Sequence, residues 1–198
     1  MKEQVQTDFD KIVKTSSFSE REIKLKKDYL NKFIENGFPN RKLENWKFSD
    51  ISQIIQKNIG ELSFYNDYSS PNKVDTSVFV DGLEHNKIVF INGRIEKIDF
   101  GYEQKNKIEI IDVQNLEKNI NSINSLVELN NAFSNKCYKL IIKSDYKLKK
   151  PLIIYHVTND QVVSKNINLR LDFELENNSS LKLIDFFKDF SEKNFLNI

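Results

Sequence analysis

The sequence predicts an α+β fold, in which an N-terminal helical region with a small strand-containing segment precedes a part built from strands. Two observations predict this division. Before residue 137, apolar side chains recur mainly at helical spacing. From Cys137 onwards they occur in short runs separated by polar turns. We therefore expect two regions, with residues 1–136 as the helical or α+β region and residues 137–198 as the strand core.

The clearest helix is predicted over residues 19–36. Ser19 and Glu22 have the spacing of a capping box, and Gly37 and Pro39 end the helix. Its apolar stripe consists of Ile23, Leu30, Phe33 and Ile34. This pattern is typical of a helix that packs one face on a core.

Three further helices are predicted in the same region. A weaker pattern covers residues 5–14, and a short helix follows Ser49 or Asp50, either of which can cap it. We expect this short helix to turn its isoleucines inward, namely Ile51, Ile54 and Ile55. Asp112 can cap another helix, which continues or re-forms over residues 129–133. The apolar positions of this last helix are Leu116, Ile120, Ile123 and Val127.

A β-hairpin is predicted in the middle of the chain. Residues 87–91 and 94–98 are short apolar runs joined by Asn92-Gly93, a dipeptide that favours a tight turn. Residues 107–111 form a third candidate strand. These strands make up the strand-containing segment of the N-terminal region.

Only strands are predicted after Cys137, over residues 138–142, 152–157, 167–175 and 181–187. The strict alternation in residues 167–175 predicts one buried face, made of Ile167, Leu169, Leu171, Phe173 and Leu175. Regularly spaced short strands fit a sandwich or a β-solenoid. Residues 191–198 begin another strand with no capping element behind it, as expected for a solenoid cut in mid-course.

The composition excludes several classes of function. Thirty basic and 29 acidic residues leave a formal charge of +1, so no global field attracts nucleic acid or an anionic membrane. The apolar stretches are shorter than the roughly 20 residues that span a bilayer. The first residues lack the pattern of a secretory signal. We therefore expect a cytoplasmic protein.

Few side chains have the sequence surroundings that chemistry requires. Cys137 is the only cysteine and stands beside strand-forming residues, which indicates a small buried hydrophobe rather than a reactive thiol. His156 lies in an apolar strand and is interpreted as structural, and His85 lies in a predicted loop that suggests no role. The lysines of residues 143–150 could contact nucleic acid, but lysines beside a proline typically mark a solvated turn.

A motif after the first clear helix resembles a known family. Residues 37–51 have the sequence Gly-Phe-Pro-Asn-Arg-Lys-Leu-Glu-Asn-Trp-Lys-Phe-Ser-Asp-Ile. This segment is similar to the N-terminal signature of SufD proteins, in the SufB/SufD family of iron-sulfur cluster assembly proteins. The matching positions are Arg41, Glu44, Trp46, Lys47 and Phe48. Three later stretches resemble the family in the same order, namely residues 88–94, 129–133 and 149–152.

The resemblance implies a non-enzymatic scaffold subunit. It implies that the N-terminal region leads into the first coils of a right-handed parallel β-helix, truncated here, and that a C-terminal helical region would dock on the ATPase subunit SufC. The paralogue SufB pairs with such a subunit through the β-helices. The complete complex assembles the iron-sulfur cluster, and this chain binds no cofactor itself. Because the family's candidate cluster residues lie near the missing C-terminal part, no catalytic, cofactor-binding or metal-binding residue is assigned here.

The signature residues have two interpretations. Exposed Trp and Arg side chains often dominate the energetics of interfaces. A lone Trp46 packed on the preceding helix, with Arg41 and Glu44 paired beside it, explains the same residues without a partner. We expect the structural role.

Two rival functions remain at this point. A carbohydrate-active β-helix enzyme needs clustered carboxylates, and Asp172 and Glu174 project from the same face of one strand. Arg170 beside them favours an ordinary charged face instead. The second rival is a nucleic-acid-binding β module, which the nearly neutral charge disfavours.

Overall fold

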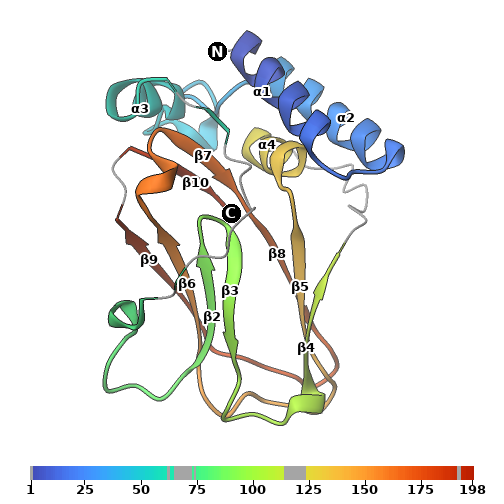
Figure 1. Cartoon of the computed structure of the whole chain (residues 1–198), viewed down its shortest axis with the longest axis vertical. Helices are drawn as coiled ribbons and strands as arrows, with labels where there is room; N and C mark the ends of the chain where they lie inside the picture. Colours follow the sequence, from blue (N-terminus) through green and yellow to red (C-terminus); the bar gives the residue numbers. More distant parts are fainter. Residues whose placement is uncertain (1, 62, 65–72, 74, 114–123, 191–192) are drawn as a thin grey trace.

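The computed structural model describes residues 2–61, 63–64, 73, 75–113, 124–190 and 193–198. The helices gather at one end of the molecule and the sheets extend away from them (Figure 1). The α+β class predicted from the sequence is confirmed. Within this described part of the chain, no helix combines the length and the apolar character that a bilayer crossing needs.

The helical end consists of α1 (Lys2–Thr15), α2 (Glu20–Asn36), α3 (Ile51–Asn58) and α4 (Ser125–Phe133). The predicted capping box begins α2, because the Glu22 N–H donates to the Ser19 hydroxyl and the Ser19 N–H donates to the Glu22 carboxylate. Gly37 ends the helix with φ 69°, a conformation that glycine adopts without strain. A short 3-10 turn, η1 (Glu44–Trp46), lies between α2 and α3.

The strands are β1 (Ser63–Phe64), β2 (Asn86–Ile91), β3 (Arg94–Asp99), β4 (Ile108–Asp112), β5 (Cys137–Ile142), β6 (Leu152–Thr158), β7 (Lys165–Asn168), β8 (Arg170–Leu175), β9 (Leu183–Asp189) and β10 (Phe195–Asn197). They form three sheets, with the strand orders β1-β7-β10, β3-β2-β6-β9 and β4-β5-β8. The predicted hairpin of β2 and β3 is confirmed, with Asn92 at φ 51° and Gly93 at φ 82° in its turn.

The chain passes through the three sheets twice in the same order. We call each of these rounds a coil: β5, β6 and β7 form the first coil, and β8, β9 and β10 form the second. Each strand pairs in parallel with its counterpart in the next round, as shown by Cys137 opposite Arg170, Leu152 opposite Leu183 and Asn166 opposite Phe195. The second coil therefore lies directly on the first.

Asparagine side chains fix the corner between the two coils. Asn130 of α4 donates at 2.8 Å to the carbonyl oxygens of both Leu169 and Asn197. Asn197 in turn donates at 3.0 Å to the side-chain oxygen of Asn168, the residue opposite it in the register. The Asn197 carbonyl oxygen also accepts the backbone N–H of Leu169 at 3.0 Å, so the polar groups at this corner are hydrogen-bonded.

Three apolar clusters form the core. The helical cluster includes Phe9, Leu30, Phe33, Leu129 and Phe133. The interior between the sheets includes Ile88, Phe90, Leu140, Ile142 and Leu152. The outer face of β2 and β6 includes Val89, Ile153 and Tyr155, and is covered by Val78 and Phe79. Strand β6 is therefore buried on both faces.

Two predictions about helix faces were wrong. Ile54 is 47% exposed, because Ile55 takes the inward position of α3. Val127 is also exposed, and Asn124 caps α4, whereas Asp112 ends strand β4. The predicted positions Leu116, Ile120 and Ile123 lie outside the described residues.

The predicted strand over residues 167–175 is two strands. The chain turns at Leu169, so that β7 and β8 belong to different sheets. Leu169 is buried, but Phe173 and Leu175 are exposed rather than part of one continuous buried face. Leu169 at the corner and Leu171 of β8 both pack in the apolar cluster between the sheets, so the alternation continues past the corner.

Candidate functional site

The strongest candidate surface is the second coil, which we call the open coil. Its strands β8, β9 and β10 each stand at the end of a sheet, so one backbone edge of each has no paired strand among the described residues. Large apolar side chains on or beside the open coil are 40% to 60% exposed, namely Phe173, Leu175, Leu183, Ile184, Phe187 and Phe190. Free strand edges beside exposed apolar area are typical of a surface that another segment covers.

The exposed apolar side chains of β8 lie next to buried side chains of the first coil. Phe173 stands opposite Leu140, and Leu175 stands opposite Ile142. Both residues of β5 are fully buried, since β5 lies between β4 and β8. Strand β8 has a described neighbour on one side only. The difference in burial therefore comes from the number of neighbouring strands and not from the direction of the side chains.

An aromatic stack links the interior to the open coil. The ring of His156 lies between Phe90, at 5.6 Å between centroids, and Phe187, at 4.8 Å, with the planes within 17° of parallel. His156 Nε2 lies 3.3 Å from Asp185 Oδ1, while Nδ1 has no partner among the described residues. Burial lowers the pKa of His156 below 6.5, although the Asp185 carboxylate acts in the opposite direction. The neutral ring packs as one step of the stack, in agreement with a structural role.

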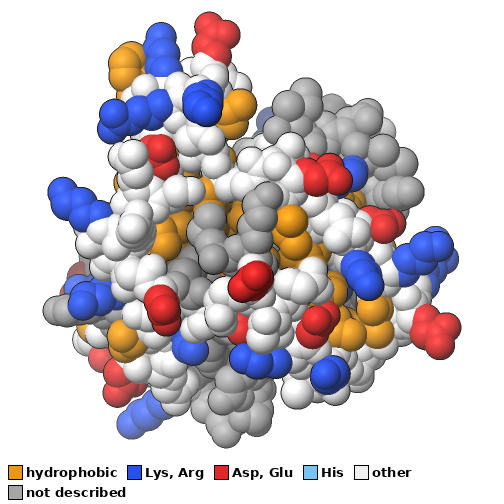
Figure 2. All heavy atoms as spheres, turned by 90° about the horizontal axis from the view of Figure 1, so that it is seen from above, with side chains coloured by type: hydrophobic (Ala, Val, Ile, Leu, Met, Phe, Trp, Pro, Cys, Tyr) orange, Lys and Arg blue, Asp and Glu red, His pale blue; other side chains and the backbone are white. Residues whose placement is uncertain are grey.

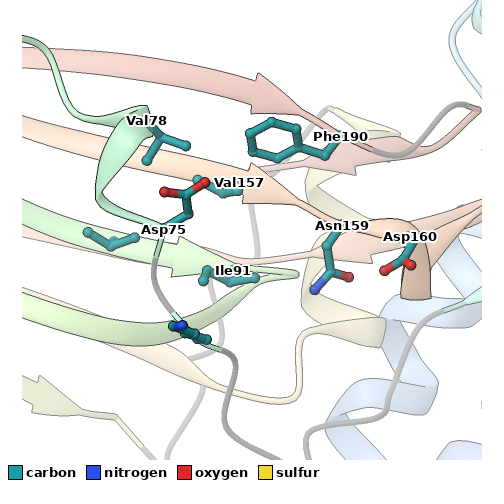
Figure 3. A pocket seen from close by; sticks show the side chains of 9 residues that line it. Asp75, Val78, Ile91, Val157, Asn159, Asp160 and Phe190 are labelled. Carbon is teal, nitrogen blue, oxygen red and sulfur yellow. The ribbon is translucent and has the colours of Figure 1, made fainter.

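A pocket of about 380 Å³ opens on the outer face of β2 and β6 (Figure 3). Its apolar walls include Val78, Ile91 and Val157, and Asp75 and Asp160 bring carboxylates to it. The backbone N–H of Ser77 donates to Asp75 at 2.9 Å and lowers the pKa of this carboxyl group. Asp75 is thus ionised and engaged in capping a 3-10 turn, so the pocket offers a binding surface rather than an acid–base pair.

A second, polar cavity of about 330 Å³ is lined by Lys26 and Cys137. Lys26 Nζ donates to the carbonyl oxygens of Ser134 at 2.5 Å and Asn131 at 3.3 Å, at the C-terminal end of α4. Burial lowers the pKa of Lys26 to about 8 and raises the pKa of Cys137 to about 11. Lys26 therefore ties α2 to α4, and the Cys137 thiol is protonated at neutral pH.

The family-signature residues lie at the surface between α2 and α3. Trp46 is half-buried, while Arg41, Glu44, Lys47 and Phe48 are exposed, with Phe48 at 85%. Within the described residues, Arg41 and Glu44 do not form the ion pair that we expected beside Trp46. Two exposed side chains gain little from pairing in water, so the sequence spacing alone did not bring them together.

The lysine-rich turn is organised by a carboxylate that the sequence analysis missed. Glu103 accepts hydrogen bonds from the backbone N–H groups of Lys149 and Lys150 and from the hydroxyl of Tyr146. Lys150 Nζ also pairs with Glu84 at 2.5 Å. Glu103 lies 43 to 47 residues before its partners in this turn, so no local pattern could reveal it.

His85 lies in a loop, as predicted, and its side chain is buried. Its Nδ1 is 2.6 Å from the Leu83 carbonyl oxygen and its Nε2 is 2.7 Å from the Tyr155 hydroxyl. The same hydroxyl accepts from the Val80 N–H at 3.0 Å. These bonds hold residues 80–85 against the outer face of β6.

The carboxylates of β8 are engaged in ion pairs. Arg170 donates from Nε and Nη2 to the two oxygens of Asp172, both at 2.9 Å. Glu174 pairs with Lys139 of β5 at 3.2 Å. Both acidic residues therefore belong to a charged face whose ion pairs lie within β8 and between β8 and β5.

No protein-family model and no curated protein matches this chain. The described residues hold no group of three or more His, Cys, Asp or Glu side chains placed to bind a metal ion.

Proposed function

We propose that the chain is a scaffold of the SufD type, a non-enzymatic cytoplasmic subunit for iron-sulfur cluster assembly. The proposal includes a right-handed parallel β-helix, of which β5 to β10 form two coils. One observation carries it: the second coil lies on the first in parallel register in all three sheets and exposes the continuation of the buried interior. The signature at Arg41, Glu44, Trp46, Lys47 and Phe48 supports the same family.

A scaffold role follows from what the open coil offers. Among the described residues, β8, β9 and β10 each present one unpaired strand edge to a further coil, and the exposed apolar side chains give that coil a surface to cover. We propose that stacked coils carry the contact with SufB, and that SufC binds a C-terminal helical part of the complete protein. The cluster is the product of the assembled complex in this proposal, and no residue of the described chain is assigned to its chemistry.

Co-expression tests this proposal. The protein made from its complete reading frame is expected to co-purify with SufB and SufC as a stable complex. Phe187→Glu, which places a charge on the open coil, should reduce the yield of that complex at least tenfold. Tyr102→Glu, in the turn after β3, should leave the yield unchanged. Three soluble proteins that do not associate would overturn the proposal.

The rival functions have weaker support from the described residues. The ion pairs of Asp172 and Glu174 leave neither carboxylate free to act as acid or nucleophile. Basic and acidic side chains are mixed on the face seen from above (Figure 2). Cleavage of a glycan, or oligonucleotide binding with strong salt dependence, would favour one of the rivals instead.

A further inference from the structure

A second exposed surface lies between α2 and α3. Phe48 is the most exposed large hydrophobic side chain of the described residues, at 85%, and Leu43 and Ile54 nearby are 51% and 47% exposed. A hollow of about 360 Å³ lies here, lined by Arg41, Phe48, Ile54 and Lys57. We call these four residues, with Lys47, the basic-aromatic surface. Apolar side chains around a hollow are a common feature of protein-binding sites.

The backbone under this surface is fixed. The Trp46 N–H donates to the Leu43 carbonyl oxygen at 2.8 Å, and the Ser49 N–H donates to the Trp46 carbonyl oxygen at 2.8 Å. The Ile51 N–H donates to the Pro39 carbonyl oxygen at 3.1 Å, and the Asp50 side chain caps α3. Below them, buried Phe38 and Ile55 anchor the segment in the helical cluster. Phe48 is therefore held outward by ordered structure, which lowers the entropic cost of binding.

The charge around the hollow is positive. Arg41 and Lys57 line it, and Lys47 places its Nζ 4.9 Å from the centre of the Phe48 ring. Within the described residues, none of these three cations forms an ion pair. The Asp50 carboxylate, which also lines the hollow, accepts the Gln53 N–H at 3.0 Å. A ligand with carboxylates beside an apolar group complements this arrangement.

We propose that the basic-aromatic surface binds an acidic segment of a partner protein, which places one apolar side chain in the hollow beside Phe48. Carboxylates on either side of that side chain would then meet Arg41 and Lys57. A hollow of about 360 Å³ favours a protein segment over a membrane, because a lipid surface presents no protruding group to fill it. The five side chains of this site come from the connection between α2 and α3 and from α3 itself, whereas the open coil consists of β8, β9 and β10.

Fluorescence of Trp46 gives a direct measurement, because it is the only tryptophan of the chain and lies half-buried in η1. The probe is a short synthetic peptide of glutamates with a central leucine and phenylalanine. We expect a saturable change in Trp46 emission that weakens with salt. A peptide of the same length with lysines in place of the glutamates should give no change.

Variants locate the binding site. Phe48→Ser and Arg41→Glu should each weaken peptide binding about tenfold or more, as loss of a central interface residue does. Tyr102→Ser, another exposed aromatic at the far end of the sheets, should bind as the unchanged protein does. Far-UV circular dichroism checks that each variant is folded.

Three results would overturn the proposal. The first is no binding of the acidic peptide by calorimetry. The second is binding that Phe48→Ser and Arg41→Glu leave unchanged. The third is a Trp46 response to phosphatidylserine vesicles without a response to the peptide, which would identify a membrane site instead.

Discussion

Replacement of Glu103 gives the sharpest test of how the sheets are joined. Its carboxylate accepts from Asn86 Nδ2 at 2.8 Å, from the Tyr146 hydroxyl at 2.7 Å, and from the backbone N–H groups of Lys149 and Lys150 at 3.0 and 3.1 Å. The contacts join the turn after β3 to β2 and to the connection between β5 and β6. Glu103→Ala removes the acceptor of all four donors at once.

The expected cost follows from these four bonds. A hydrogen bond to a charged group contributes ~1.5–3 kcal/mol. At a half-buried site, water can replace part of the hydrogen bonding that the four donors lose. We therefore expect Glu103→Ala to lower the free energy of unfolding by ~3 kcal/mol in total. Burial opposes ionisation, but the hydrogen bonds prevail and lower the pKa of Glu103 below 4.5. Because the folded pKa is below the unfolded one, this stabilisation is complete above about pH 4.5 and is lost as the pH falls through the folded pKa.

Urea unfolding followed by far-UV circular dichroism measures this cost at neutral pH and again near pH 4. Glu84→Ala is the matched control, because Glu84 contacts the side chain of Lys150 but is 65% exposed. Exposed ion pairs contribute ~0–1 kcal/mol, so the control should change little. Equal effects of the two variants, or a loss below ~1 kcal/mol for Glu103→Ala, would refute the reasoning.

Three further outcomes are expected. Because burial lowers the pKa of His156 below 6.5, the unchanged protein should lose stability as the pH falls below about 6.5. Urea titrations should show a smaller loss of stability for His156→Phe. Equal losses for the two proteins would contradict this. Iodoacetamide at about pH 8 should label Cys137 far more slowly in the folded chain than in urea, because burial raises its pKa to about 11; similar rates would argue against a buried thiol. Light scattering should show that the 198-residue chain alone associates as its concentration rises, and that the Phe187→Lys variant associates less. A sharply monodisperse monomer at high concentration would exclude association through the open coil.

Features with local causes were predictable from the sequence. The capping box of Ser19 and Glu22 and the Asn92-Gly93 turn depend on residues within three positions of each other. The strand positions after Cys137 were predicted to within a few residues for the same reason, since short apolar runs between polar turns mark each of them.

Features set by distant residues were not predictable. The carbonyl oxygen that Lys26 contacts at 2.5 Å lies 108 residues further along the chain, so its role at the end of α4 left no local pattern. Ile54 and Ile55 are neighbours of equal hydrophobicity, and only the packing of α3 decides which is buried. Apolar and polar residues do alternate over residues 167–175, but an alternating pattern does not show where the chain turns from one sheet to the next, as it does at Leu169.

The two candidate surfaces suit different partners because their backbones differ. Along the open coil, β8, β9 and β10 each have a free edge among the described residues, so a further strand can gain backbone hydrogen bonds as well as apolar contact. In the segment below Phe48, the N–H groups of Trp46, Ser49 and Ile51 are already engaged. That surface offers mainly side chains to a partner, which gives charge a larger part in selecting it. We therefore expect a stacked coil to be recognised through strand pairing and an acidic segment through charge, so salt should weaken only the second contact strongly.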